Sequence, residues 1–254
     1  MHMFDRAHHM YGGHAIVAGQ CPLALGIAFA IQHQQEKKLC ACYLGDGALN
    51  QGAFHESMNL SSIWSLPILW VCENNRYSMG TSIERGTSVA EDLSVKAAAY
   101  GMPYAQCDGM EVLATYDCVK PLADRIRTGG GPVFLNARTY RYKGHSMSDP
   151  QKYRSKEEVA DMQQRDPINT LVNHLIDRKL ASQAQVDELD QRAKQTARDA
   201  VRFADESKPT PPQELYTDVY ANPFGPYRKG ELPRMLAESD EATKRRGDEG
   251  GEGE

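Results

Sequence analysis

The stretch Leu39-Cys40-Ala41-Cys42-Tyr43-Leu44-Gly45-Asp46-Gly47-Ala48-Leu49-Asn50 decides the fold. It is a short apolar run that ends in glycine and aspartate, which is typical of a buried strand followed by a turn. Residues 67–72 form a second apolar run, and the polar sequence Glu73-Asn74-Asn75-Arg76-Tyr77 follows it. Residues 50–64, between the two runs, have the spacing of an amphipathic helix. This strand–helix–strand unit predicts an α/β fold built on a parallel sheet.

The same alternation continues along the first 150 residues. We expect a largely buried helix at 22–36, a weaker strand at 104–107 and a fourth strand at 132–137. Ser88 and Glu91 have the spacing of a capping box and predict a helix that ends near Gly101. A further helix is expected at 111–127, although Pro121 should kink or interrupt it. The predicted fold class is therefore α/β, with a parallel sheet and helices on both of its faces.

The pattern changes after residue 150. Ser155 and Asp166 are predicted to cap two short helices, and a third helix is expected from about Ser182 to Phe203. Prolines recur between residues 208 and 234, and the residues after 240 are charged and rich in glycine. The sequence thus predicts an α/β domain at 1–150, a helical appendage at 151–207, an extended arm at 208–239 and a disordered tail at 240–254.

The composition excludes several classes of protein. The chain has 254 residues, of which 41% are hydrophobic and 25% charged, and this is ordinary for a soluble globular protein. A net charge of −5 argues against nucleic acid as the main partner. No apolar run is long enough to cross a membrane, and the first residues lack the apolar core of a signal peptide.

The six cysteines contain no C-x-x-C pair and mostly lie in apolar surroundings, which is typical of reduced thiols rather than a zinc site. We therefore expect a cytoplasmic protein of bacterial type. The mitochondrial matrix and the plastid remain open as alternatives.

Polar segments follow all four predicted strands, and in a parallel sheet such segments meet at one edge, where ligands bind. Asp46 offers a carboxylate oxygen, Asn75 an amide oxygen, and the backbone near Tyr77 a carbonyl oxygen. Mg²⁺ prefers oxygen ligands of these kinds, together with the phosphates of a substrate or cofactor. Either motif alone would read as an ordinary turn. Their pairing after neighbouring strands predicts a magnesium site.

The residues after Asp46 favour a phosphate next to this metal. Gly47 and Ala48 precede a predicted helix, so free backbone N–H groups could meet the phosphate there. Glycine at positions 45 and 47 would also permit close approach of the backbone. We therefore expect a diphosphate held by the metal and by these amides.

Several longer stretches resemble the alpha subunits of the pyruvate dehydrogenase first component, which belong to the thiamine-diphosphate-dependent 2-oxo acid dehydrogenases. The resemblance covers nearly the whole chain up to about residue 228 and is clearest in Met1-His2-Met3-Phe4, Gly12-Gly13-His14-Ala15-Ile16-Val17, Gly45-Asp46-Gly47, Glu73-Asn74-Asn75-Arg76-Tyr77-Ser78-Met79-Gly80-Thr81 and Arg141-Tyr142-Lys143-Gly144-His145-Ser146-Met147-Ser148-Asp149-Pro150. It implies a thiamine-diphosphate-binding fold. It also implies that Asp46, Asn75 and the Tyr77 carbonyl bind Mg²⁺, and that Gly47 and Ala48 contact the diphosphate.

Four further positions acquire implied roles from the same resemblance. Ala15, where relatives often have glycine, and Val17 would line the aminopyrimidine pocket, largely through their main chain. His145 follows the fourth strand in a polar loop, where an imidazole could bind a phosphate or act as an acid or base near neutral pH. The resemblance places His145 beside the cofactor and makes it the catalytic candidate. Ser146 matches a position that is phosphorylated in mitochondrial relatives, but for this chain we expect an unmodified loop serine.

The resemblance also implies what the chain lacks. The alpha subunits carry a segment before the Met-His-Met stretch, with a Tyr-Arg pair that grips the diphosphate, so we expect the α/β domain to be N-terminally incomplete. The glutamate that activates the cofactor comes from a beta subunit, which implies an α2β2 assembly that is active only when complete. The implied reaction is the oxidative decarboxylation of pyruvate, with transfer of the acetyl group to the lipoyl domain of dihydrolipoyl acetyltransferase.

Three alternatives stay open at this point. Branched-chain 2-oxo acid dehydrogenase and acetoin dehydrogenase share the fold, although the stretches around Tyr77 and His145 favour pyruvate. A non-catalytic interaction module that binds only beta subunits is the alternative from a different class.

Overall fold

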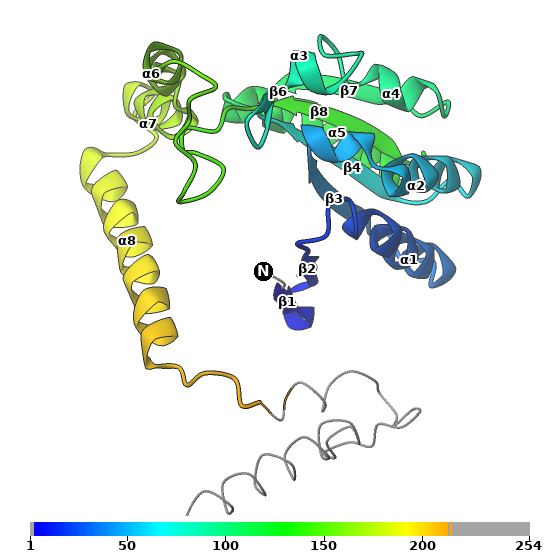
Figure 1. The fold of residues 1–254 in the computed structure, drawn as a ribbon, viewed down its shortest axis with the longest axis horizontal. Coiled ribbons are helices and arrows are strands. Elements are labelled where there is room, and N and C mark those ends of the chain that lie inside the picture. The colour runs from blue at the N-terminus through cyan, green and yellow to red at the C-terminus, as the bar shows by residue number, and fades with distance from the viewer. Residues whose placement is uncertain (1–2, 213, 215–254) are drawn as a thin grey trace, which may run out of the picture. The chain divides into compact units, whose positions relative to one another are not determined.

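Four parallel strands form the main sheet, and they are the four that the sequence predicts. The computed structural model describes residues 3–212 and residue 214. The sheet has the order β3-β4-β8-β7, in which every neighbouring pair is parallel (Figure 1). The strands are β3 (Cys40–Gly45), β4 (Ile68–Asn74), β7 (Tyr104–Asp108) and β8 (Val133–Arg138).

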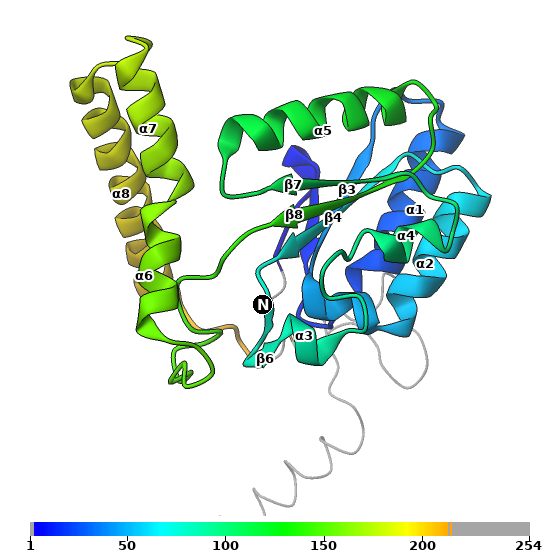
Figure 2. The same ribbon diagram turned by 90° about the horizontal axis from the view of Figure 1, so that it is seen from above.

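Helices cover both faces of this sheet, which confirms the predicted fold class. Figure 2 shows α5 (Val112–Arg127) on one face and α1 (Gln20–His33), α2 (Gly52–Ile63) and α4 (Val95–Ala98) on the other. Each face has its own apolar core, because successive side chains of a strand point to opposite sides. On β4, for example, Trp70 belongs to the core beneath α1 and α2, whereas Leu69 and Val71 belong to the core beneath α5.

Two predicted helices differ from the structure. Residues 88–94 form turns, and the helix expected from Ser88 is reduced to α4. There the Asp92 carboxylate accepts a hydrogen bond from the Ser94 backbone N–H (2.8 Å), and a local contact of this kind competes with a helical turn. In contrast, α5 runs through Pro121 without interruption, and the Glu111 side chain caps its first turn.

Short elements connect the larger ones. An antiparallel pair, β1 (Met3–Asp5) and β2 (Met10–Gly13), encloses the 3-10 helix η1 (Arg6–His8). A second 3-10 helix, η2 (Asp46–Asn50), follows β3 directly. After β4, a two-stranded hairpin and one short helix complete the connection: β5 (Tyr77–Ser78), β6 (Thr81–Ser82) and α3 (Ile83–Gly86).

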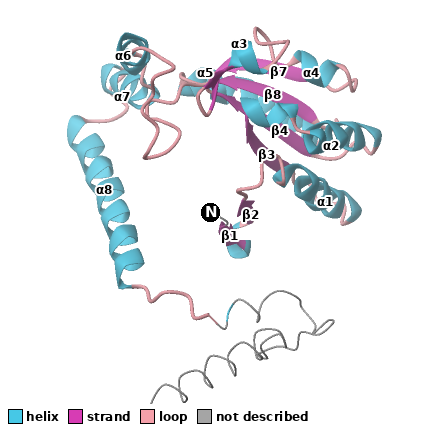
Figure 3. Ribbon diagram, viewed as in Figure 1, coloured by secondary structure: helices cyan, strands magenta, loops and turns pink. Residues whose placement is uncertain are grey.

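The described residues after 155 contain helices and no strands (Figure 3). They form α6 (Lys156–Gln164), α7 (Pro167–Asp177) and α8 (Gln183–Glu206). The predicted caps are confirmed, because the Ser155 hydroxyl accepts the Glu158 N–H and the Asp166 carboxylate caps α7. Among the described helices, none is both long and apolar enough for a membrane span.

The chain divides into two compact units, one ending at Gln183 and the other beginning at Ala184. The predicted division into domain, appendage, arm and tail stays a prediction. The tail at 240–254 and most of the arm at 208–239 lie outside the described residues.

Candidate cofactor and metal site

The carboxyl ends of the strands bring polar residues into a row across the sheet. Asn74, the last residue of β4, lies opposite Arg138, and Arg138 lies opposite Asp108. On the other side of β4, Gly45 is paired with Glu73, so Asp46 begins η2 one residue beyond the paired strands. This edge is where open α/β sheets bind ligands.

Asp46 is a buried carboxylate with one oxygen that no described residue satisfies. The residue is 6% exposed, and its Oδ1 accepts a hydrogen bond from the Gly47 N–H at 2.7 Å. Its Oδ2 is buried and has no hydrogen-bond partner among the described residues. Burial raises the pKa of this carboxyl, opposed by hydrogen bonds from the Gly47 and Arg76 backbones and by the charge of Arg141. A buried oxygen without a partner is costly unless a cation or proton occupies it.

Asn75 lies in the turn between β4 and β5, and Tyr77 is the first residue of β5, which contacts η2. Asn75 Oδ1 accepts the Tyr77 N–H at 3.1 Å, so the amide oxygen is held on the inside of the turn. The Tyr77 carbonyl accepts a hydrogen bond from Arg141 Nη1 at 3.0 Å.

These donors fit Mg²⁺ in kind, because they supply one carboxylate, one amide and one main-chain oxygen. The described residues contain no cluster of three or more His, Cys, Asp or Glu side chains placed to hold a metal. A metal at Asp46 would therefore depend on the amide and main-chain oxygens as well.

The structure gives glycine at position 47 a reason that sequence reasoning did not identify. An ideal Cβ atom built on Gly47 would lie 2.1 Å from Ser78 Oγ and 2.6 Å from Ser78 Cβ. The Ser78 side chain thus packs against the Gly47 backbone, and it ties the β5 hairpin to the start of η2. Gly45 has no such neighbour, since nothing lies within 4 Å of its ideal Cβ position. The expected contact of Gly47 and Ala48 with a diphosphate stays a prediction.

Arg141 links residues 75–77, which we call the candidate metal turn, to the loop that carries His145. Its guanidinium donates to the carbonyls of Tyr77 (3.0 Å) and Met79 (2.7 Å) and to the Tyr153 hydroxyl (2.9 Å). Sequence reasoning placed Arg141 in a polar segment after the fourth strand and gave it no role. No local pattern could reveal the role, because the two carbonyls that Arg141 binds in the hairpin after β4 lie 62 and 64 residues away in sequence.

His145 lies in an exposed loop that Asp149 organises. Asp149 Oδ2 accepts the His145 N–H and the Tyr153 hydroxyl, each at 2.7 Å, and Oδ1 accepts the Gln151 N–H at 2.9 Å. These hydrogen bonds lower the pKa of Asp149 to about 2. The His145 imidazole itself makes no hydrogen bond or ion pair with a described residue. Its catalytic role therefore stays a prediction. So does the expectation that Ser146, whose hydroxyl lies 3.2 Å from that of Ser148, is an unmodified loop serine.

A cluster around Arg154 forms the base of this loop. The guanidinium donates to the carbonyls of Arg141, Tyr142 and Lys143, and it lies over the rings of Tyr77, Tyr140 and Tyr153. The hydroxyls of Tyr77 and Tyr140 donate to Glu158 Oε1 at 3.0 and 2.8 Å. Burial and this carboxylate raise the pKa of Tyr140 to about 12. The cluster therefore connects the candidate metal turn, the His145 loop and α6.

Ala15 and Val17 are not joined to the other candidates by any hydrogen bond in the described part of the chain. Both lie in the turns between β2 and α1, where Ala15 is exposed and the exposed fraction of Val17 is 58%. The structure thus brings together Asp46, Gly47, Asn75 and Tyr77, with the His145 loop attached through Arg141. The implied role of Ala15 and Val17 stays a prediction.

Comparison with known proteins shows the family of the chain. The model of the dehydrogenase E1 component family matches residues 1–213. The pyruvate dehydrogenase E1 component subunit alpha of Rickettsia felis is 43% identical over 221 residues, which are 87% of this chain and 67% of that protein. The subunit of the same name from Rhizobium meliloti is 43% identical, over 86% of this chain and 63% of its own length. The mitochondrial type I subunit of Ascaris suum is 38% identical, over 96% of this chain and 62% of its own length.

The match is extensive, although this chain spans only about two thirds of the length of these relatives. The matched residues include both the candidate metal turn and the His145 loop. The chain belongs to the dehydrogenase E1 component family.

Proposed function

We propose that this chain is the alpha subunit of a pyruvate dehydrogenase first component that binds thiamine diphosphate and Mg²⁺. Its reaction is the oxidative decarboxylation of pyruvate, with transfer of the acetyl group to the lipoyl domain of dihydrolipoyl acetyltransferase. The names of the relatives described above support this reaction over the branched-chain and acetoin alternatives.

The observation that carries the proposal is the buried Asp46 Oδ2, which has no partner among the described residues and lies at the carboxyl edge of the sheet. Asp46, Asn75 and the Tyr77 carbonyl would hold the metal. Gly47 and Ala48 would face the diphosphate, although the Gly47 N–H already donates to Asp46 Oδ1.

The cofactor, when bound, supplies the electron sink for loss of carbon dioxide. The chain's own residues bind and orient it. Arg141 fixes the Tyr77 carbonyl and, through Tyr153 and Asp149, the loop that carries His145. The His145 imidazole is exposed and free of partners in the described residues, so it can hold or transfer a proton beside the cofactor. Ala15 and Val17 would form the wall of the aminopyrimidine pocket.

Activity is proposed to require a beta subunit, which supplies the activating glutamate in an α2β2 assembly. The test is calorimetry of the co-expressed complex with thiamine diphosphate and Mg²⁺. We expect saturable binding for the native protein and none for Asp46→Asn. An intact complex that shows no heat of binding would favour the non-catalytic interaction module.

The substrate is tested separately in the same complex. Pyruvate should be turned over faster than branched-chain 2-oxo acids or acetoin. Preference for either of the others would overturn the substrate assignment while leaving the cofactor site intact.

We further propose that the protein acts in a bacterial cytoplasm, as several bacterial relatives suggest. Immunodetection in fractionated cells of the source organism tests this assignment. A signal in mitochondria, the compartment named for the Ascaris suum relative, would contradict it.

A further inference from the structure

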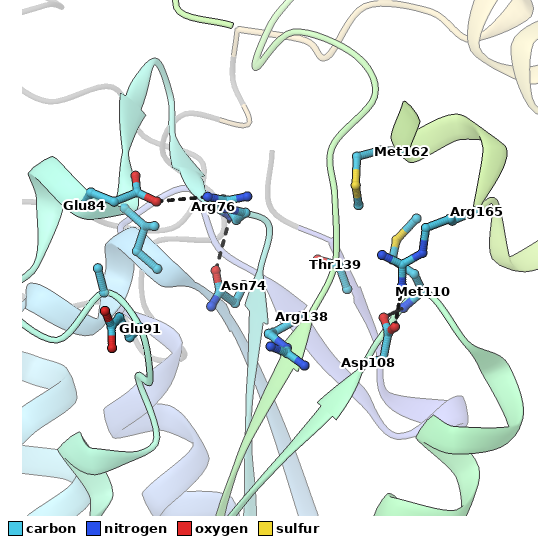
Figure 4. A pocket seen from close by; sticks show the side chains of 12 residues that line it. Asn74, Arg76, Glu84, Glu91, Asp108, Met110, Arg138, Thr139, Met162 and Arg165 are labelled. Carbon is cyan, nitrogen blue, oxygen red and sulfur yellow. Dashed lines mark hydrogen bonds and ion pairs between the residues drawn. The ribbon is translucent and has the colours of Figure 1, made fainter. Parts of the chain in front are cut away.

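A cavity of about 450 Å³ lies at the same edge of the sheet, next to the candidate metal turn, from which Arg76 lines it (Figure 4). Its walls come from the ends of β4, β7 and β8, from the segment around α3 and from α6. Asp46, Asn75 and Tyr77 do not line it. The volume is within the usual range for small-molecule sites, roughly 300–1,000 Å³.

The floor of the cavity is built by strand register. Asn74, Arg138 and Asp108 lie opposite one another on three adjacent strands, so their side chains leave the same face of the sheet. Asn74 is only 5% exposed, and its Oδ1 accepts the Arg76 N–H at 3.2 Å. Its side-chain amide N–H groups donate to no described residue. The floor therefore offers a guanidinium and an amide donor next to each other.

Four of the charged side chains that line the cavity form ion pairs with one another, and two are unpaired among the described residues. Arg165 is paired with Asp108 at 2.6 Å, and Arg76 is paired with Glu84 at 3.0 Å. The side chains of Arg138 and Glu91 line the cavity without an ion pair or hydrogen bond to any described residue. The cavity thus presents one unpaired positive and one unpaired negative group, on different walls (Figure 4).

The remaining lining consists of Thr139 and of four apolar residues, Ile83, Ala90, Met110 and Met162. Methionine side chains adapt readily to the shape of an apolar ligand. A ligand that matches all of these groups carries a carboxylate, an ammonium group and an apolar body.

We propose that this cavity binds a free amino acid with an apolar side chain. The carboxylate is bound by Arg138 and Asn74, because a guanidinium accommodates a carboxylate in a bidentate, charge-assisted pair. The ammonium group is bound by Glu91, and the side chain packs against Met110 and Met162. The site lies beside the proposed cofactor site and does not depend on it.

Calorimetry on the full chain, co-expressed with the beta subunit proposed above, tests the site with L-leucine as the probe. Two analogues isolate the charges: 4-methylpentanoate lacks the ammonium group, and 3-methylbutan-1-amine lacks the carboxylate. We expect L-leucine to bind at least tenfold more tightly than either analogue. Saturating thiamine diphosphate and Mg²⁺ should leave its affinity unchanged.

Two variants assign the contacts. Arg138→Gln should weaken L-leucine binding at least tenfold. Glu91→Gln should lower the affinity for L-leucine to the affinity that the native protein has for 4-methylpentanoate. The matched control is Arg127→Gln, which removes an exposed arginine at the end of α5 and should change nothing.

Absence of L-leucine binding to the folded complex would overturn the proposal, as would equal affinity in Arg138→Gln. Competition between L-leucine and thiamine diphosphate would also overturn it, because the two sites would then be one. The first two of these results are independent of whether the cofactor itself binds.

Discussion

The Ser78 side chain occupies the space that any side chain on residue 47 would need, since an ideal Cβ on Gly47 lies 2.1 Å from Ser78 Oγ. The two residues belong to different connections, one after β3 and the other after β4. Their contact sets the spacing between η2, which carries Asp46, and the hairpin that carries the Tyr77 carbonyl. Glycine is therefore required at position 47 by the protein itself, whether or not a phosphate binds there.

The first prediction is that Gly47→Ala destabilises the protein by about 1–3 kcal/mol, the usual cost of overpacking. Ser78→Gly in the same chain removes the clash and should restore most of the lost stability, because the two positions are directly coupled. Chemical denaturation of the four proteins of this cycle measures the coupling. Gly45→Ala is the control and should be nearly neutral in the absence of cofactor. Simple additivity of the two substitutions would refute the contact.

The second prediction concerns the pH dependence that Asp46 imposes on the metal-free protein. Its folded-state pKa is raised, mainly by burial, so the ionised carboxylate destabilises the fold above that pKa. Asp46→Asn should therefore be the more stable protein at pH 8 without metal, by on the order of 1 kcal/mol. This advantage should shrink as the pH falls through the folded-state pKa toward the ordinary value of 3.8, because the native carboxyl then becomes protonated.

At pH 8, Mg²⁺ should make the native protein more stable than Asp46→Asn. It neutralises the buried oxygen in the native protein and stabilises it by mass action, whereas the variant has lost the carboxylate. Thermal unfolding with and without Mg²⁺ and thiamine diphosphate measures both effects. A native protein that already exceeds the variant in stability without metal would contradict this description of Asp46.

The third prediction is that Arg141→Gln loosens two segments at once. The carbonyls of Tyr77 and Met79 lose their guanidinium donor, and leaving such groups unsatisfied costs about 1–3 kcal/mol each where they are buried. The His145 loop loses its link to the same group through Tyr153. Limited proteolysis should therefore cut within residues 142–155 faster in the variant. Arg127→Gln, an exposed arginine on α5, should leave the cleavage rate unchanged, and equal rates in both variants would refute the link.

The fourth prediction follows from the depressed pKa of Asp149, which hydrogen bonds from the His145 and Gln151 backbones and from Tyr153 lower to about 2. A lowered folded-state pKa means that the carboxylate stabilises the loop above its ordinary pKa of 3.8 and loses this effect as the pH falls from there toward 2. The backbone amides of His145 and Gln151 should therefore be protected from hydrogen exchange at neutral pH. Asp149→Asn should lose protection at these two amides and keep it in α5. Unchanged protection in the variant would show that the loop is ordered by other contacts.

The four strands of the sheet could be predicted from the sequence, because each is a short apolar run followed by polar residues. The run at 67–72 is apolar on both faces, as a strand buried between two helical layers requires, and β4 is buried on both faces. The run at 39–44 was expected to be a buried strand as well, but β3 is an edge strand of the sheet and Tyr43 on it is exposed. The N-caps at Ser155 and Asp166 were equally local, and both were found. The helix predicted from Ser88 was wrong. The capping-box spacing is also a local signal, and here the Asp92–Ser94 hydrogen bond overrides it.

The candidate site was predictable only in part. Asp46 and Asn75 were found because each follows a strand in a recognisable pattern. Ser78, Arg141 and Arg154 were missed because their roles arise from partners far away in sequence, such as the Gly47 backbone and the rings of Tyr77 and Tyr140. The cavity around Arg138 was missed as well, since it depends on the register of three strands.

The central claim is that Asp46, Asn75 and the Tyr77 carbonyl form one divalent-cation site. The most direct test is a crystal structure of the complex with the beta subunit, grown with thiamine diphosphate and with Mn²⁺ in place of Mg²⁺. We predict a single strong anomalous peak, directly coordinated by Asp46 Oδ2, Asn75 Oδ1 and the Tyr77 carbonyl. A peak elsewhere, or bound cofactor with no metal at Asp46, would contradict the account.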